Sequence, residues 1–260
     1  MANNGLQILK IGGKLFEEPK TLNQVLDDFL SLPGKKIIVH GGGKRASQLG
    51  QDLGHPAPMI DGRRITDATS LEIVTMVYAG LYNKNLVANL QAKGANALGL
   101  SGADGNLIQA HKRIVKTIDY GFAGDIDAVD GEGIGRLLNA DFMPVFCAIT
   151  HDRKGQLLNT NADTIAAQLA IAMAEYYQVD LHLLLDLDGV MLDPKDASSL
   201  IKQLDYVSYQ QYQNQGIIHA GMIPKLDNAF EVFNTGVRVN ICGPKTLVKG
   251  GTKLSHISKE

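Results

Sequence analysis

Short apolar runs that end in glycine and lead into a helical period recur along this 260-residue chain. The first run, residues 6–11, ends at the glycine pair 12–13, and the next, residues 36–40, ends at the glycine triplet 41–43. Runs of this length and composition predict buried strands. Because parallel neighbours need helix-length connections, the alternation predicts an α/β protein with a mainly parallel sheet covered on both faces.

The same pattern places the other elements and one weak domain boundary. We predict further strands at residues 97–100, 107–113, 124–129, 144–149, 181–187 and 237–242. We predict helices at residues 21–32, 45–53, 68–93, 133–139, 162–177, 209–215 and 224–234. Prolines within residues 54–62 predict a loop or an irregular hairpin there. The boundary falls at residues 177–179, where a long helix ends and the next strand begins.

The composition limits the classes of partner and the cellular compartment that we expect for this protein. The chain is 45% hydrophobic and 20% charged, and its net charge of −2 argues against nucleic acid or an anionic membrane as a partner. No apolar run reaches the roughly 18–20 residues of a membrane span, and the start lacks a signal-peptide pattern, so we expect a cytoplasmic protein. Cys147 and Cys242 lie in apolar runs and are expected to be buried thiols, neither a disulfide nor a metal pair.

The two glycine turns favour phosphate binding. A strand that runs into glycines and then a helix exposes backbone N–H groups, which attract phosphate oxygens together with the helix N-terminus. The alternative is a tight turn that needs glycine only for a positive φ. Two such turns on consecutive strands, with Lys10 before one and Lys44 after the other, favour the phosphate interpretation. Ligands of α/β sheets bind at strand carboxyl ends, where both turns lie.

Two common nucleotide motifs fit this chain poorly. The P-loop pattern Gly-x-x-x-x-Gly-Lys-Ser/Thr is absent. Residues 41–46 match the loose dinucleotide pattern G-x-G-x-x-A, which also needs an acidic residue about 20 positions later. Asp61 has that spacing but lies in the proline-rich loop, so a nicotinamide enzyme is the weaker alternative.

Two lysines are candidates for catalysis. Lys10 lies within an otherwise apolar strand, where a lysine is costly to bury unless it is paired or functional. A solvent-facing position on an edge strand is the alternative. Lys225 follows Pro224 at a predicted helix start, and its position alone favours a surface role.

Polar clusters complete the candidate site. Segment 159–163, Asn-Thr-Asn-Ala-Asp, opens the helix predicted at 162–177. A single N-cap needs fewer polar side chains, and Asp163 is a candidate to hold two lysines by charge-assisted hydrogen bonds. Arg63 and Arg64 adjoin a loop and are suited to bidentate capture of a carboxylate, with solvated surface as the alternative.

The remaining polar residues give weaker signals. Segment 186–190, Asp-Leu-Asp-Gly-Val, ends a predicted buried strand and either borders a nucleotide or merely turns. The spacing of five histidines supports no metal site: His40, His151, His182, His219 and His256. No Ser/His/Asp set is visible from spacing.

Taken in order, these segments resemble the acetylglutamate kinases of the amino acid kinase family. The resemblance covers nearly the whole chain and becomes weaker after about Cys242. The matching motifs are Leu9-Lys10-Ile11-Gly12-Gly13, Val39-His40-Gly41-Gly42-Gly43, Gly62-Arg63-Arg64-Ile65-Thr66-Asp67, Asn83-Lys84, Gly99-Leu100-Ser101-Gly102, Asn159-Thr160-Asn161-Ala162-Asp163, Asp186-Leu187-Asp188-Gly189-Val190 and Gly221-Met222-Ile223-Pro224-Lys225. The glycine turns and Lys10 are shared across the wider family. The motifs at 64–66 and 159–163 are more specific to acylglutamate kinases and differ from those of uridylate, carbamate and aspartate kinases.

The resemblance implies a fold and a reaction. The fold is a three-layer αβα sandwich, with residues 1–178 as a lobe for acylglutamate binding and dimerisation and residues 179–260 as a lobe for ATP binding. The reaction is ATP-dependent phosphorylation of the γ-carboxylate of N-acetyl-L-glutamate, which gives N-acetyl-L-glutamyl 5-phosphate in arginine biosynthesis. The cofactor is ATP with Mg2+ held mainly by phosphate and water.

The resemblance also implies roles for individual residues. Lys10 and Lys225 neutralise the phosphoryl group in the transition state, and Asp163 orients both. The expected substrate-binding residues are Gly42 and Gly43 for the reacting carboxylate, with Arg64 and Asn159 for the α-carboxylate and neighbouring groups. The expected ATP-binding residues are Gly12, Gly13, Asp186, Leu187, Asp188, Gly189, Val190, Met191, Ile217, Ile218 and His219.

Two departures from the family pattern carry their own expectations. Arg63 stands where the family usually has leucine. It is either a surface substitution or an extra cation for a longer, acidic acyl group, which makes N-succinyl-L-glutamate the alternative substrate. The first strand starts by about Leu6 and leaves no room for the additional helix of arginine-inhibited members, so we expect an arginine-insensitive homodimer. Another carboxylate kinase of the family is the nearest rival function. A non-catalytic effector sensor would lack the two lysines and Asp163.

Overall fold

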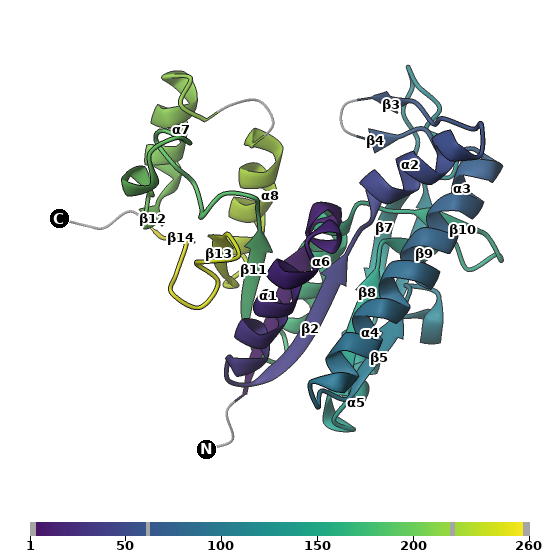
Figure 1. Cartoon of the computed structure of the whole chain (residues 1–260), viewed down its shortest axis with the longest axis horizontal. Coiled ribbons are helices and arrows are strands. Elements are labelled where there is room, and N and C mark those ends of the chain that lie inside the picture. The colour runs from purple at the N-terminus through teal and green to yellow at the C-terminus, as the bar shows by residue number, and fades with distance from the viewer. Residues whose placement is uncertain (1–3, 61–62, 219–221, 257–260) are drawn as a thin grey trace.

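An eight-stranded sheet forms the centre of the protein (Figure 1). The computed structural model describes residues 4–60, 63–218 and 222–256. The strands lie in the order β12-β14-β13-β11-β1-β2-β8-β5, and each of these pairs is parallel except β13 with β14. Their bounds are Gly5–Ile11 (β1), Lys35–His40 (β2), Ala97–Leu100 (β5), Met143–Cys147 (β8), Gln178–Leu184 (β11), Gln203–Leu204 (β12), Arg238–Cys242 (β13) and Thr252–Leu254 (β14). The predicted mainly parallel sheet is confirmed.

Helices cover both faces of this sheet and complete a three-layer αβα sandwich. They are α1 and α4 on one face and α5, α6 and α8 on the other, with bounds Pro19–Ser31 (α1), Asn83–Ala92 (α4), Gly131–Asn139 (α5), Ala162–Met173 (α6) and Ile223–Phe233 (α8). Leu9 and Ile11 belong to the core beneath α1, whereas Leu6 and Ile8 belong to the core beneath α6. Successive side chains of a strand point to opposite faces, so Lys10 points toward α6.

Smaller elements surround the carboxyl ends of the central strands. A second sheet has the order β10-β9-β6-β7, with bounds Leu157–Asn159 (β10), Ile149–His151 (β9), Ile108–Lys112 (β6) and Gly124–Val129 (β7). The other elements are hairpin strands Met59–Ile60 (β3) and Arg63–Arg64 (β4), helices Gly43–Asp52 (α2) and Tyr206–Asn214 (α7), and short helical turns Gly13–Glu17 (η1), Asp104–Asn106 (η3) and Ala197–Ser199 (η4). Figure 1 shows β3, β4, α2 and α3 (Ala68–Thr75) at one end of the molecule and α7 with β12 at the other.

The long helix predicted at residues 68–93 is continuous but not uniform. It consists of α3 (Ala68–Thr75), a π-helical segment η2 (Met76–Tyr82) and then α4. The wider π turns accompany the burial of Tyr78 and Tyr82, whose rings pack on Gly42. Local π-helix is frequent at functional sites, and here it lies beside the second glycine turn.

Several predicted boundaries differ from the observed ones. The strand predicted at 144–149 divides at Ala148, where the chain leaves the central sheet (β8) and enters the smaller one (β9). The strand predicted at 181–187 ends at Leu184, so segment 186–191 forms a loop beyond the sheet. The helix predicted to end at 177 ends at Met173. The predicted irregular hairpin is β3–β4 and extends to Arg64.

Buried polar side chains link three neighbouring strands of the central sheet. His182 on β11 donates through Nε2 to Oε1 of Gln7 on β1, at 2.8 Å, and accepts through Nδ1 from Nδ2 of Asn240 on β13, at 3.2 Å. Nδ2 is an amide donor, so Nδ1 must accept and the ring is neutral. Burial lowers the pKa of His182 from 6.5 to about 4, with Asp180 opposing the shift and Lys253 adding to it.

Folding stability is therefore expected to fall as the pH drops below about 6.5. Unfolded His182 binds a proton there, whereas the folded residue does so only near pH 4, and the resulting loss is about 2 kcal/mol at pH 5. The buried His40, whose pKa burial also lowers to about 4, is expected to add a similar loss. Urea unfolding of wild type and His182→Gln at pH 7.5 and pH 5 tests this, because the variant should lose less stability between the two. Equal losses would contradict the assignment.

Candidate functional site

The two predicted glycine turns lie against each other at the edge formed by the strand carboxyl ends. β1 and β2 are parallel neighbours, so their ends at Ile11 and His40 are adjacent. A Cβ added to Gly13 would lie 3.2 Å from the Cα of Gly42. Both turns line one cavity of about 220 Å³, which Lys10, Arg64, Asn159 and Asp163 also line. The structure thus brings these predicted residues together.

Close packing, rather than backbone conformation, requires glycine at positions 13 and 42 of the two turns. None of the five at positions 12, 13, 41, 42 and 43 has a φ in the left-handed region between about +20° and +160°, so the alternative of a turn that needs glycine for a left-handed backbone is wrong. Gly42 lies beneath aromatic rings, and an added Cβ would be 2.7 Å from Cδ1 of Tyr78. Around Gly12, by contrast, an added Cβ would meet nothing within 4 Å, because the residue faces open space at the cavity. Open space beside bare backbone N–H groups suits a phosphate.

Lys10 is buried and paired. Its residue is 8% exposed, and Nζ lies 2.7 Å from Oδ1 of Asp163. β1 pairs with β2 on one side and β11 on the other, so the edge-strand alternative for Lys10 is wrong. Asn161 caps α6 by accepting from the N–H of Asp163 at 2.7 Å, which fixes Asp163 in the first turn. Asn161 therefore caps the helix, and the side chain of Asp163 forms the ion pair with Lys10.

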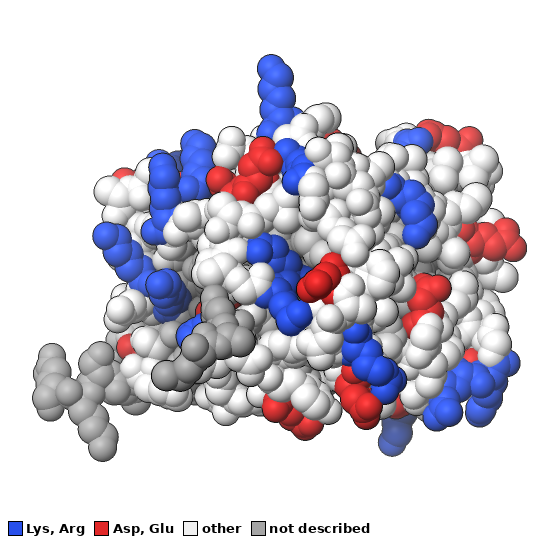
Figure 2. All heavy atoms as spheres, turned by 90° about the horizontal axis from the view of Figure 1, so that it is seen from below, with Lys and Arg blue, Asp and Glu red and all other residues white. Residues whose placement is uncertain are grey.

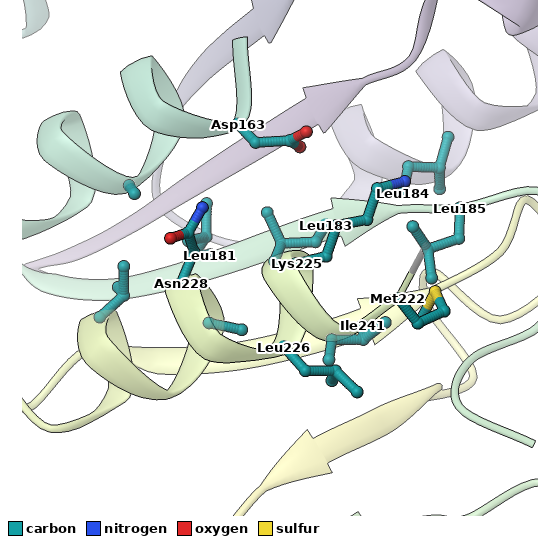
Figure 3. A pocket seen from close by; sticks show the side chains of 13 residues that line it. Asp163, Leu181, Leu183, Leu184, Leu185, Met222, Lys225, Leu226, Asn228 and Ile241 are labelled. Atoms are coloured by element: carbon teal, nitrogen blue, oxygen red, sulfur yellow. The ribbon is translucent and has the colours of Figure 1, made fainter. Parts of the chain in front are cut away.

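Lys225 approaches the same place from another element. It lies near the start of α8, and its half-buried side chain lines a narrow gap of about 20 Å³ with Asp163 of α6 and Leu184 of β11 (Figure 3). Among the described residues, Asp163 forms an ion pair with Lys10 and none with Lys225. The structure thus contains the contact of Asp163 with Lys10, and the expectation that Asp163 also holds Lys225 stays a prediction.

The far side of the cavity carries the groups suited to a carboxylate. Arg64, 7% exposed on β4, donates through Nη2 to the carbonyl of Gly43 at 2.9 Å and to Oγ of Ser47 at 2.6 Å. Asn159, at the end of β10, donates through Nδ2 to Oγ1 of Thr66 at 3.0 Å. A guanidinium has five N–H donors in a planar fork, and so can bind a carboxylate while keeping these contacts.

Burial raises the pKa of the Tyr78 hydroxyl, with Arg64 opposing the shift. The ring therefore stays neutral and contributes packing on Gly42 and a hydroxyl near Arg64. Tyr78 and Ser47 are site residues that sequence reasoning missed, whereas Thr66 belongs to the predicted motif at 64–66 but has no predicted role of its own. Tyr78 gave no signal of its own, because its role depends on how the long helix packs on the glycine turn.

The predicted nucleotide residues divide into two groups. Gly12 and Asp186 line a separate cavity of about 90 Å³ with Lys14, whose Nζ lies 3.0 Å from Oδ2 of Asp186. The other group consists of the loop after β11 and of Ile217 and Ile218, which follow α7. Val190, Met191 and Ile218 are buried, and Leu187 is exposed. The loop is anchored where Thr252 Oγ1 accepts from the N–H of Val190, at 2.8 Å. His219 lies outside the described residues.

Charge and metal chemistry limit what this site can hold. Figure 2 shows basic and acidic side chains interspersed on one face of the molecule, in keeping with the net charge of −2. Within residues 4–60, 63–218 and 222–256, no group of three or more His, Cys, Asp or Glu could hold a metal ion. Over the same residues, no helix is long and apolar enough to cross a membrane. An anion in this cavity would have to be held by the few cationic side chains and backbone N–H groups that line it.

The chain is similar in sequence to one known protein family. Residues 5–243 match the model of the amino acid kinase family. The chain belongs to the amino acid kinase family. It is 48% identical over 233 residues to the acetylglutamate kinase of Parabacteroides distasonis, covering 90% of this chain and 91% of that protein. It is 49% identical over 251 residues to the acetylglutamate kinase of Bacteroides fragilis, covering 96% of each.

Solved structures agree on the fold of this family member. A crystal structure of a Streptococcus mutans protein matches with a TM-score of 0.76 at 25% identity, covering 96% of this chain and 98% of that one. The N-acetylglutamate synthase of Neisseria gonorrhoeae, complexed with coenzyme A and N-acetyl-glutamate, matches with a TM-score of 0.81 at 22% identity, covering 98% of this chain and 60% of that one. At that identity the likeness shows a shared fold alone. The nicotinamide alternative does not fit this family membership.

Proposed function

We propose that this amino acid kinase is an acetylglutamate kinase, which transfers the γ-phosphoryl group of ATP to the γ-carboxylate of N-acetyl-L-glutamate, as in arginine biosynthesis. One observation carries the proposal. Two adjoining glycine turns meet in a single cavity that has the ion pair of buried Lys10 with half-buried Asp163 at one side and Arg64 at the other. The relatives that bear this name and align over nearly the whole chain support the same substrate.

The chemistry needs charge neutralisation more than a base. A γ-carboxylate is already ionised at neutral pH, so it needs no base to attack phosphorus. One carboxylate oxygen forms a bond to the γ-phosphorus while the bond from that phosphorus to the β-phosphate oxygen breaks, and ADP leaves with the electron pair. Negative charge on the phosphoryl oxygens is the main obstacle, and Lys10 and Lys225 neutralise it. Backbone N–H groups of the two glycine turns complete the cradle.

The remaining predicted residues position the two substrates. Gly42 and Gly43 receive the reacting carboxylate, and Arg64 with Asn159 holds the α-carboxylate and its neighbours. Gly12 and Gly13 contact the phosphoryl group, and residues 186–191 and 217–219 line the nucleotide. We assign acylglutamate binding to a lobe of residues 1–178 and ATP binding to a lobe of residues 179–260. Closure of these lobes would bring Lys225 toward Asp163.

Magnesium is proposed to enter with ATP. A protein site for Mg2+ would need carboxylates placed around the ion, and the described residues offer no such cluster. The residues present fit an ion held by triphosphate oxygens and water, with Asp186 and Glu18 as the carboxylates that line the smaller cavity. When bound, the ion would supply charge neutralisation on the phosphates.

A homodimer is proposed from two features of the amino-terminal lobe. The outward face of the α3–η2–α4 helix exposes Met76 (53%) and Leu81 (45%), which lie about one π turn apart. β5 is the last strand of the central sheet on the same side. Light scattering is expected to give twice the 28.0 kDa mass of the chain, and Met76→Glu with Leu81→Lys should halve it. A wild-type mass of one chain would contradict the proposal.

The direct test of function is product trapping. Purified protein is incubated with ATP, Mg2+, hydroxylamine and one acceptor: N-acetyl-L-glutamate, N-succinyl-L-glutamate or L-glutamate. The proposal expects a γ-hydroxamate and equimolar ADP with the acetylated acceptor, and little with free glutamate. A hydroxamate only with another acid would instead indicate a different carboxylate kinase of this family.

N-succinyl-L-glutamate is the second candidate substrate, because Arg63 is half-buried and lines the same cavity as Arg64. If Arg63 binds the extra carboxylate, kcat/KM for the succinyl substrate should exceed that for the acetyl substrate. Arg63→Leu should then lower the succinyl value about tenfold or more while leaving the acetyl value within about twofold. A clear acetyl preference in the wild type would remove this alternative.

A further inference from the structure

His40 is a buried titratable side chain beside the cavity that takes no part in the proposed phosphoryl transfer. His40, the last residue of β2, is 0% exposed and directly precedes the second glycine turn. Its Nδ1 lies 2.9 Å from the carbonyl oxygen of Gly41, and its Nε2 lies 3.1 Å from Nδ2 of Asn83. Phe16 packs edge-on against the ring, with centroids 5.5 Å apart. The ring is thus fixed on both nitrogens and on one face.

The hydrogen-bond chemistry fixes the tautomer of His40. Nδ2 of Asn83 also lies 2.9 Å from the carbonyl oxygen of Val145, which can only accept, and Oδ1 of Asn83 accepts from Nζ of Lys84 at 3.2 Å. Nδ2 is therefore the donor toward His40, and Nε2 must accept. The proton of the neutral ring is on Nδ1 and is donated to the Gly41 carbonyl. Burial, which lowers the pKa of His40 to about 4, keeps the ring neutral at physiological pH.

This contact determines which way the Gly41–Gly42 peptide faces. The described chain contains no cis peptide bond, and in a trans peptide the C=O and the N–H point in roughly opposite directions. With the Gly41 carbonyl held on the buried histidine, the Gly42 N–H points away from it. That N–H has no hydrogen-bond partner among the described residues, and Gly42 lines the cavity of about 220 Å³.

We propose that His40, held in one tautomer by Asn83, is a positioning residue that keeps the Gly42 N–H turned toward the reacting carboxylate. This inference rests on the proposed function. A peptide between two glycines has no Cβ to resist rotation, so it needs an external contact to hold one orientation. In the flipped orientation a carbonyl oxygen would face the carboxylate, and repulsion would replace a charge-assisted hydrogen bond.

The test compares two isosteric variants. His40→Asn keeps an N–H donor at the position of Nδ1, whereas His40→Leu has the same branched shape without a donor. Both lose the contact with Asn83 and leave the same space, so their difference isolates the bond to Gly41. Calorimetry with N-acetyl-L-glutamate should give a Kd at least about tenfold higher for the leucine variant than for the asparagine variant. The Kd for the non-hydrolysable ATP analogue AMP-PNP should agree within about twofold.

The outcomes separate this inference from the proposed function. Equal acylglutamate affinities in the two variants would overturn the positioning role, and a parallel loss of nucleotide affinity would indicate a merely structural residue. Wild-type protein that neither binds N-acetyl-L-glutamate nor forms its hydroxamate would instead overturn the proposed function. If His40→Leu does not fold, Asn83→Leu decides: it frees the tautomer, and the acylglutamate Kd should rise while that of AMP-PNP stays constant.

Discussion

Replacing Lys10 by methionine is expected to lower kcat about a thousandfold while changing either KM less than about tenfold. The charge on the phosphoryl oxygens is greatest in the transition state, so a buried cation beside them contributes mainly to kcat. The Lys10 side chain is 10% exposed, so its charge is less screened than that of a surface lysine. Steady-state kinetics of the trapped hydroxamate measures both constants.

The control for Lys10→Met is Lys20→Met, the same substitution at an exposed position of α1. It should leave kcat unchanged. Asp163, the partner of Lys10, is 25% exposed at its side chain and can be solvated, so Lys10→Met should still fold. Thermal unfolding of both variants checks this. An unchanged kcat in folded Lys10→Met would refute the assignment.

The second large effect is expected from Gly12→Ala. The backbone of Gly12, at φ −77° and ψ 153°, suits alanine, and the new methyl group meets no protein atom within 4 Å. The variant should therefore fold as well as the wild type. The methyl group occupies the space proposed for the phosphoryl group, so kcat/KM for ATP should fall about a hundredfold or more.

A matched control for Gly12→Ala is Gly135→Ala on α5, where an added Cβ also meets nothing within 4 Å. That variant should retain full activity and gain slightly in stability, because alanine favours the helix. Binding of N-acetyl-L-glutamate should be normal in both. If Gly12→Ala kept wild-type kcat/KM for ATP, the phosphate would have to lie elsewhere.

The strand and glycine pattern predicts both the sheet and the place of the site, for a physical reason. Apolar runs that end in glycine specify buried parallel strands, and parallel strands bring their carboxyl ends to one edge. Lys10 and Asp163 are 153 positions apart in the sequence. They meet because α6 packs on the face of the sheet toward which the Lys10 side chain of β1 points. Lys10 is conspicuous as a charge in an apolar strand, whereas Asp163 could equally have been a helix cap.

Other features could not be predicted from local sequence. The division at Ala148 arises because the chain after β8 pairs with strands of a second sheet. The local hydrophobic pattern does not indicate this change of sheet. The π-helical segment depends on Tyr78 and Tyr82 packing on Gly42. His40 has no metal-like spacing, and its contact with Asn83 arises only when α4 packs on the sheet.

The proposed direct attack of the carboxylate on phosphorus is tested most directly with oxygen-18. N-acetyl-L-glutamate carrying the isotope in both γ-carboxylate oxygens is incubated with protein, ATP, Mg2+ and hydroxylamine. Hydroxylamine attacks the carbonyl carbon of the acyl phosphate and releases phosphate that keeps the bridging oxygen. Mass spectrometry should find one oxygen-18 in each phosphate formed beyond an acceptor-free control. Unlabelled phosphate would show that the carboxylate is not the nucleophile and would contradict the account.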